Sequence, residues 1–124
     1  MALAITITSV TGRQGVAEVS GKITASGNYT TGGDTLDFTK ATQDAKFSGI
    51  SAFIPSSQPP TQLSVWSANG QITNQYAPII GSAQNNSKLF VGGATFGTQL
   101  AAGAYPVAVT GDVIEFYSEF PLFQ

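Results

Sequence analysis

The run AEVSGKITA, residues 17–25, decides the fold class of this chain. Small or apolar residues occupy every odd-numbered position of the run, and polar residues occupy every even-numbered position. Successive side chains of a β-strand point to opposite faces of a sheet. The run therefore predicts a strand with one face on a core and one face in water.

Two further runs extend this pattern toward the chain ends. LAITIT, residues 3–8, alternates in the same way, and GRQG, residues 12–15, predicts the turn between it and residues 17–25. VIEFYSEF, residues 113–120, predicts a closing strand. Three of its side chains are expected in the core: Ile114, Phe116 and Phe120.

The middle of the chain reads as short strands separated by Gly, Pro and Asn. Asn-Gly at residues 69–70 predicts a hairpin between residues 62–66 and 71–76. Residues 47–54 and 107–109 are also strand-like, and residues 39–46 are the one plausible helix. We therefore expect a single all-β domain over residues 1–124, a β-sandwich or small β-barrel of jelly-roll-like type with at most one short helix.

Charge is scarce in this sequence. Asp, Glu, Lys and Arg make up 10% of the residues, against about 25% in an average protein. Between Lys46 and Asp112 the only charged residue is Lys88. Depletion of charge is typical of interface cores, so we expect extensive subunit contacts; a monomer coated by Ser, Thr, Asn and Gln is the alternative. The candidate interface residues are Phe53, Trp66, Tyr76, Ile79, Ile80 and Phe90.

Catalytic chemistry has few candidate groups here. The chain has no His and no Cys, which removes the commonest general base and the thiol nucleophile. We expect no enzyme activity, no catalytic residue and no cofactor. Asp34 and Asp37 could form half of a calcium site, but a turn role for them is favoured and no metal is expected. Glu115 and Glu119 would lie about 13 Å apart on one strand, which favours a solvated face.

Several partner classes are also disfavoured. The basic residues are few and scattered, and the isoelectric point is about 4.7, so we expect no nucleic acid. No signal peptide and no apolar run of membrane-spanning length is present, so we expect a soluble protein made without export and with no membrane partner. No small-molecule substrate is expected. Four aromatic residues could form a sugar-stacking platform, although core or interface roles are favoured for them: Tyr29, Trp66, Tyr76 and Tyr105.

Two segments support a resemblance to a known class of protein. SGNYTTGGDTLD, residues 26–37, and the aromatic closing run at residues 113–120 resemble segments of small structural proteins of tailed bacteriophages. The resemblance implies a virion protein assembled in the host cytoplasm, most simply a capsid decoration (cement) protein. Its partners would be the major capsid protein and further copies of itself, with a trimer as one candidate. The alternative is a carbohydrate- or receptor-binding β module of a phage tail or fibre.

Overall fold

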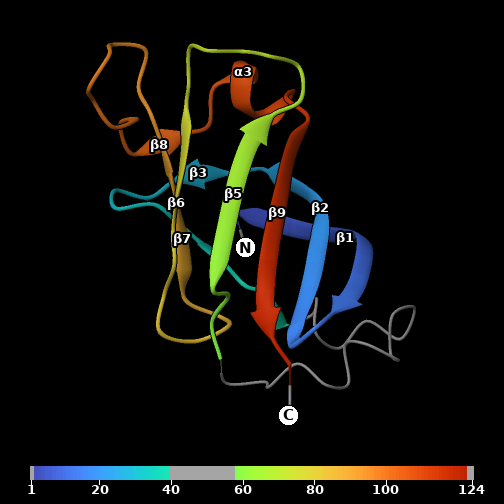
Figure 1. Ribbon diagram of the computed structural model, residues 1–124. Coiled ribbons are helices and arrows are strands. Elements are labelled where there is room, and N and C mark those ends of the chain that lie inside the picture. The colour runs from blue at the N-terminus through green and yellow to red at the C-terminus, as the bar shows by residue number, and fades with distance from the viewer. Residues whose placement is uncertain (1, 40–57, 123–124) are drawn as a thin grey trace.

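The computed structural model describes residues 2–39 and 58–122, and two antiparallel sheets dominate it (Figure 1). The four-stranded sheet has the order β1-β2-β9-β5, formed by Leu3–Arg13, Val16–Ala25, Ile114–Pro121 and Gln62–Ser67. The three-stranded sheet has the order β4-β7-β6, formed by Asp34–Leu36, Ser87–Val91 and Tyr76–Ile79. Two short strands pair separately, β3 (Asn28–Tyr29) and β8 (Gly103–Ala104), and a short helix α3 spans Val107–Thr110.

The alternation predicted for residues 17–25 is confirmed in β2. Its odd-numbered side chains are buried, whereas the even-numbered ones are half-buried or exposed. The closing strand β9 repeats the pattern, with Ile114, Phe116 and Phe120 each no more than 1% exposed. The two strands pair in register, so that their buried residues lie side by side on one face of the sheet.

Strand β1 contains a break in this periodicity. Its register against β2 shifts between Ile7 and Ser9, where a β-bulge inserts one residue. Because side chains alternate with a period of two, the extra residue moves the inward face from odd to even positions. Val10, rather than Ser9, therefore packs against the core.

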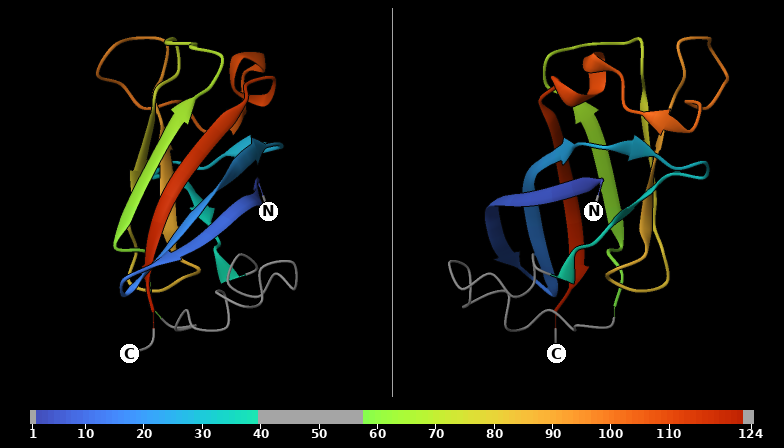
Figure 2. Two further views of the ribbon diagram at one scale, coloured as in Figure 1. Left: turned by 45° about the vertical axis from the view of Figure 1, so that its right-hand side comes forward. Right: turned by 180° about the vertical axis from the view of Figure 1, so that it is seen from behind.

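The core lies between the two sheets, which face each other in the views of Figure 2. The Phe38 ring, just after β4, contacts Phe116 and Phe120 of β9 edge-on, with ring centroids 5.6 Å apart in both pairs. Leu36 of β4 and Leu89 of β7 are fully buried in the same cluster. The predicted all-β fold is confirmed, and among the described residues the sheets are not closed into a barrel.

Two local predictions are wrong. Asn69-Gly70 forms a turn, but β5 pairs with β9 and β6 pairs with β7, so no hairpin joins β5 to β6. The chain instead crosses at this turn from one sheet to the other. Residues 107–109, predicted as a strand, form α3, because Pro106 precedes a turn in which Val109 and Thr110 donate back to the Pro106 carbonyl.

The predicted strand at residues 47–54, and the predicted helix at residues 39–46 beyond Thr39, lie outside the described residues.

Candidate functional site

Three loops at one end of the sandwich carry the most exposed large apolar side chains of the described residues. Ile72 is 80% exposed, Phe96 is 94% exposed and Val107 is 83% exposed. Their loops, residues 68–75, 92–100 and 106–111, lie at the same end in every view of Figures 1 and 2. None of the three loops contains a charged residue. We call this surface the apolar end.

The loop that carries Phe96 has a defined conformation. Gly93 N–H donates to the Thr98 carbonyl at 2.9 Å, and Thr98 N–H donates to the Thr95 carbonyl at 3.1 Å. Gly97 supplies a φ of 82° at the tip, a value that residues with a Cβ rarely adopt. These bonds leave Phe96 at the apex of the turn with its ring directed into solvent.

The half-buried side chain of Gln99 fastens this loop to the rest of the fold. Gln99 Oε1 accepts hydrogen bonds from the Tyr29 hydroxyl and from Gly32 N–H, each at 2.7 Å. Tyr29 is 2% exposed and its ring packs edge-on against Tyr105. The base of the Phe96 loop is therefore tied to β3 and to the turn that follows it.

The loop that carries Ile72 is fixed in a similar way. Gln71 and Asn74 bond to each other, with Gln71 Nε2 donating to the Asn74 carbonyl at 2.6 Å and Asn74 N–H donating to Gln71 Oε1 at 3.0 Å. Asn74 Nδ2 also donates to the Gly92 carbonyl at 2.8 Å, which links this loop to the Phe96 loop. Both apolar residues are thus held on loops that are ordered without a partner, which reduces the entropy lost on binding.

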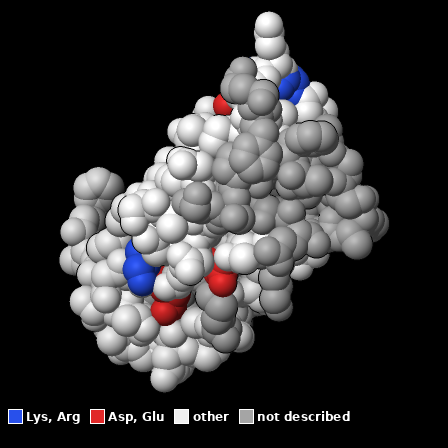
Figure 3. Space-filling model, turned by 90° about the horizontal axis from the view of Figure 1, so that it is seen from below, with Lys and Arg blue, Asp and Glu red and all other residues white. Residues whose placement is uncertain are grey.

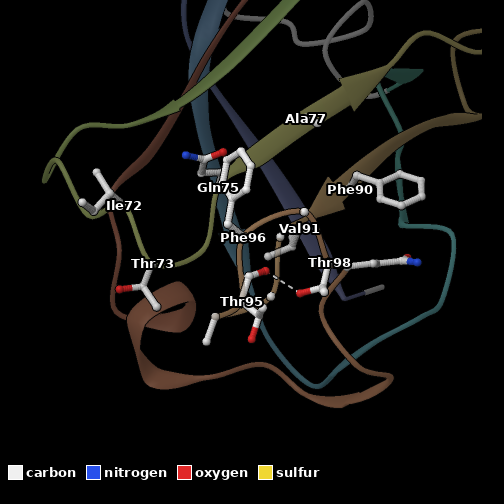
Figure 4. A pocket seen from close by; sticks show the side chains of 14 residues that line it. Ile72, Thr73, Gln75, Ala77, Phe90, Val91, Thr95, Phe96 and Thr98 are labelled. Atoms are coloured by element: carbon white, nitrogen blue, oxygen red, sulfur yellow. Dashed lines mark hydrogen bonds between the residues drawn. The ribbon is translucent and has the colours of Figure 1, made fainter.

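A hollow of about 710 Å³ lies between these loops and the upper ends of β6 and β7. In Figure 4 Ile72 and Phe90 lie on opposite sides of it, and Phe96 lies between them. None of the 14 residues that line it is charged. An apolar side chain of a partner could therefore enter it without desolvating an ion, which is the usual obstacle at a charged surface.

A polar cluster of side chains joins the end of β5 to the start of β6, where the chain passes from one sheet to the other. The Tyr76 hydroxyl donates to Asp112 Oδ2 at 2.7 Å, and the Ser67 hydroxyl donates to Asp112 Oδ1 at 2.8 Å. Burial acts to raise the pKa of Asp112, but the hydrogen bonds from Tyr76, Ser67 and Gln71 hold that pKa below its ordinary value. Burial, and then the Asp112 hydrogen bond, raise the pKa of the Tyr76 hydroxyl. The carboxylate is therefore ionised, and its oxygens accept hydrogen bonds from Ser67, Gln71 and Tyr76.

The structure brings some of the predicted interface residues together and separates others. Ile79 and Phe90 both lie on the outer face of the three-stranded sheet, and Phe90 lines the hollow. Ile80 follows β6 and is 42% exposed. Tyr76 faces inward, toward Asp112. Trp66 lies on the other sheet.

Phe53 lies outside the described residues. Among the described residues, the most exposed large apolar ones are Ile72, Phe96 and Val107, and none of these was in the predicted set. The signal that could have found them is an isolated apolar residue between glycines or polar residues. Gly92-Gly93 and Gly97 bracket Phe96, and such a short, punctuated segment cannot bury its side chain in a sheet.

A sugar-stacking platform, the less favoured alternative for the four aromatic residues, does not form from the tyrosines. Tyr29 and Tyr105 are buried, at 2% and 6% exposed, and the Tyr105 hydroxyl donates to Asp34 in the interior. Only Trp66 of that set is exposed, on the outer face of the four-stranded sheet.

The acidic pair considered for calcium is engaged in local bonds. Asp34 accepts the Tyr105 hydroxyl bond, and Asp37 Oδ1 accepts from Thr39 N–H at 2.9 Å. Within residues 2–39 and 58–122, no three His, Cys, Asp or Glu side chains gather as a metal site. In the same part of the chain, no helix has the length and apolar character that a membrane crossing requires.

Charged side chains concentrate away from the apolar end. Arg13 at the β1–β2 turn bridges Glu119 at 3.1 Å and Glu18 at 3.3 Å. Lys22 and Glu115 lie opposite each other on the same outer face of the four-stranded sheet. Figure 3, viewed from below, shows charged side chains in two small groups. The three loops of the apolar end thus carry no charged residue, whereas the outer face of the four-stranded sheet carries much of the charge of the described residues.

No protein-family model matches this chain, and comparison with curated proteins and with solved structures gives no match.

Proposed function

We propose that this chain is a non-catalytic structural protein of a tailed-phage virion, a capsid decoration protein that docks its apolar end onto the major capsid protein. The observation that supports this proposal is the exposure of Ile72, Phe96 and Val107 on three uncharged loops. Exposed apolar patches of this kind usually mark protein interaction sites. Residues 26–37 add the resemblance to phage structural proteins.

The geometry of the apolar end suits a protein partner with a side chain to insert. Phe96 offers an aromatic anchor, the type of residue that dominates binding energy at interfaces. The hollow beside it could accept an apolar side chain of the partner. The outer face of the three-stranded sheet continues this surface through Phe90 and Ile79, where the one charge, Lys88, donates to Thr35 Oγ1 at 3.0 Å.

Docking would stabilise the shell by mass action. A protein that binds only the assembled lattice shifts the equilibrium toward the assembled state. In this proposal several copies, arranged as a homo-oligomer, would sit across junctions of the lattice on the outside of the virion.

Co-sedimentation tests the proposal directly. The purified chain is mixed with capsid shells assembled from the major capsid protein encoded with it, and bound protein is measured after pelleting. We expect saturable binding that Phe96→Ser weakens at least about 30-fold, the effect of losing an anchor worth 2 kcal/mol. Trp66→Ser, on the other sheet, is the matched control and should bind as the wild type does. No binding by the wild type, or equal binding by Phe96→Ser, would refute the proposal.

A further inference from the structure

The outer face of the four-stranded sheet differs in chemistry from the apolar end. In register, Trp66 of β5 lies opposite Glu115 of β9, and Glu115 lies opposite Lys22 of β2. On the same face, Tyr117 lies between Ser64 and Ser20. This face therefore combines two aromatic rings with carboxylate, ammonium and hydroxyl groups.

The indole of Trp66 is held in a fixed position and is accessible. Its Nε1–H donates to Glu115 Oε1 at 3.3 Å, and the residue is 43% exposed. Tyr117 is the diagonal neighbour of Trp66 across the β5–β9 pair, a spacing of about 7–8 Å at Cα. The Tyr117 hydroxyl contacts Glu18 Oε2 at 2.6 Å and Glu119 Oε2 at 2.7 Å, which fixes the second ring.

Three classes of ligand fit this face poorly. The core of a protein interface is depleted of charge, whereas this face holds five charged residues: Arg13, Glu18, Lys22, Glu115 and Glu119. Its three carboxylates outnumber its two basic groups, so the phosphates of nucleic acids and anionic lipids would be repelled. A bare apolar ligand would leave the charged groups desolvated.

We propose that this face is a binding site for a neutral carbohydrate chain, centred on Trp66. The C–H face of a sugar ring packs on an aromatic ring, whose face carries partial negative charge. Sugar hydroxyls both donate and accept, so they match the adjacent carboxylate of Glu115, the ammonium of Lys22 and the hydroxyl of Ser64. These side chains form two neighbouring rows across strands β5, β9 and β2, and such an extended arrangement suits a polymer rather than a single sugar.

This inference does not rest on docking by the apolar end. The site lies on the flank of the sandwich, so a copy seated on a shell by its loops would keep the site open to solvent. A virion protein of that kind could hold the particle at a glycan-coated surface.

Affinity gel electrophoresis tests the site with dextran, β-1,3-glucan, β-1,4-xylan and α-mannan as soluble probes cast into the gel. We expect at least one probe to retard the wild type, and Trp66→Ala to weaken that binding about tenfold, as expected for loss of a stacking contact. Trp66→Tyr should retain part of the binding, because it retains an aromatic face. Phe96→Ala is the matched control and should be retarded as the wild type is.

Two results would overturn this inference: no retardation of the wild type by any of these four neutral polysaccharides, or equal retardation of the wild type and Trp66→Ala. Circular dichroism and thermal melting of each variant show whether it is folded. Shell co-sedimentation of Trp66→Ala separates this site from the docking proposal, because shell binding should survive the change.

Discussion

Gly21 of β2 lies directly opposite Phe116 of β9, and it leaves no room for a side chain of its own. A Cβ atom at position 21 would lie 2.0 Å from the Thr6 carbonyl oxygen and 2.9 Å from Phe116 Cε1. The glycine lets β1 approach β2 closely, and the Phe116 ring covers the space that a side chain at position 21 would fill. This cross-strand contact offsets the destabilising effect of a glycine inside a strand.

Gly21→Ala should therefore destabilise the fold. Overpacking a well-filled site costs about 1–3 kcal/mol, and here one of the clashing atoms is backbone that cannot rotate away. Chemical denaturation of the variant should show a lower midpoint. Gly92→Ala is the matched control, because its Cβ would meet nothing closer than 3.4 Å. Equal stability of Gly21→Ala and wild type would show that the strands are not packed as described.

The buried hydrogen bond between Tyr105 and Asp34 gives a second prediction. Tyr105→Phe removes the donor and leaves the Asp34 carboxylate, 9% exposed, without that partner. An unsatisfied buried group costs about 1–3 kcal/mol. Thermal melting should show this loss for Tyr105→Phe. Tyr117→Phe removes a hydroxyl from the solvated outer face of the four-stranded sheet and should lose much less stability. A larger loss for Tyr117→Phe than for Tyr105→Phe would contradict the buried position of the Tyr105–Asp34 hydrogen bond.

A third prediction concerns acid. The pKa of Asp112 is lower in the folded state than its ordinary value of 3.8, so between those two values the unfolded chain binds more protons. Stability from this group is complete above the ordinary value and is lost as pH falls through the folded pKa. Denaturation midpoints measured from pH 6 down to pH 2 should therefore fall less steeply for Asp112→Asn than for wild type. Parallel pH curves for the two proteins would show that Asp112 does not contribute to the loss of stability in acid.

The strand faces could be predicted from the sequence because alternation is a local property. The odd and even positions of residues 17–25 and 113–120 settle which side chains enter the core, whatever strand lies beside them. Strand pairing is not local in this way. Asn69-Gly70 carries a strong signal for a hairpin that would pair β5 with β6. Instead, β5 pairs with β9, which is remote in sequence, and Ala68 N–H donates to the Val113 carbonyl.

The candidate site could be predicted only in part. Low charge predicted an interface, and Ile79 and Phe90 do share the outer face of the three-stranded sheet, on which Lys88 also lies. Tyr76 illustrates why the positions of the others could not be predicted. The exposure of a side chain depends on which sheet face it takes, and Asp112, which accepts the Tyr76 hydroxyl bond, is 36 residues away. Phe96 is exposed because its loop is closed by backbone bonds that the sequence does not reveal.

The apolar end leads to a prediction about stability as well as binding. Phe96→Ser should change the free energy of unfolding by no more than about 0.5 kcal/mol, since the ring contributes almost nothing to the core. It should also reduce self-association and precipitation at high concentration, measured by light scattering. A large loss of stability would mean that Phe96 is a packing residue and not a docking anchor.

The central claim is that the apolar end becomes covered in the assembled particle. The chain has no Cys, so a single introduced cysteine is the only thiol of each variant, and its labelling rate reports whether that position is covered. Ala94→Cys places a thiol in the Phe96 loop, and Thr24→Cys places one on the outer face of β2. Maleimide labelling is measured for each variant alone and bound to capsid shells. We predict that the cysteine at position 94 labels readily in the free protein and many times more slowly on the shell, while the cysteine at position 24 labels equally in both. Unchanged labelling at position 94 on the shell would contradict the account.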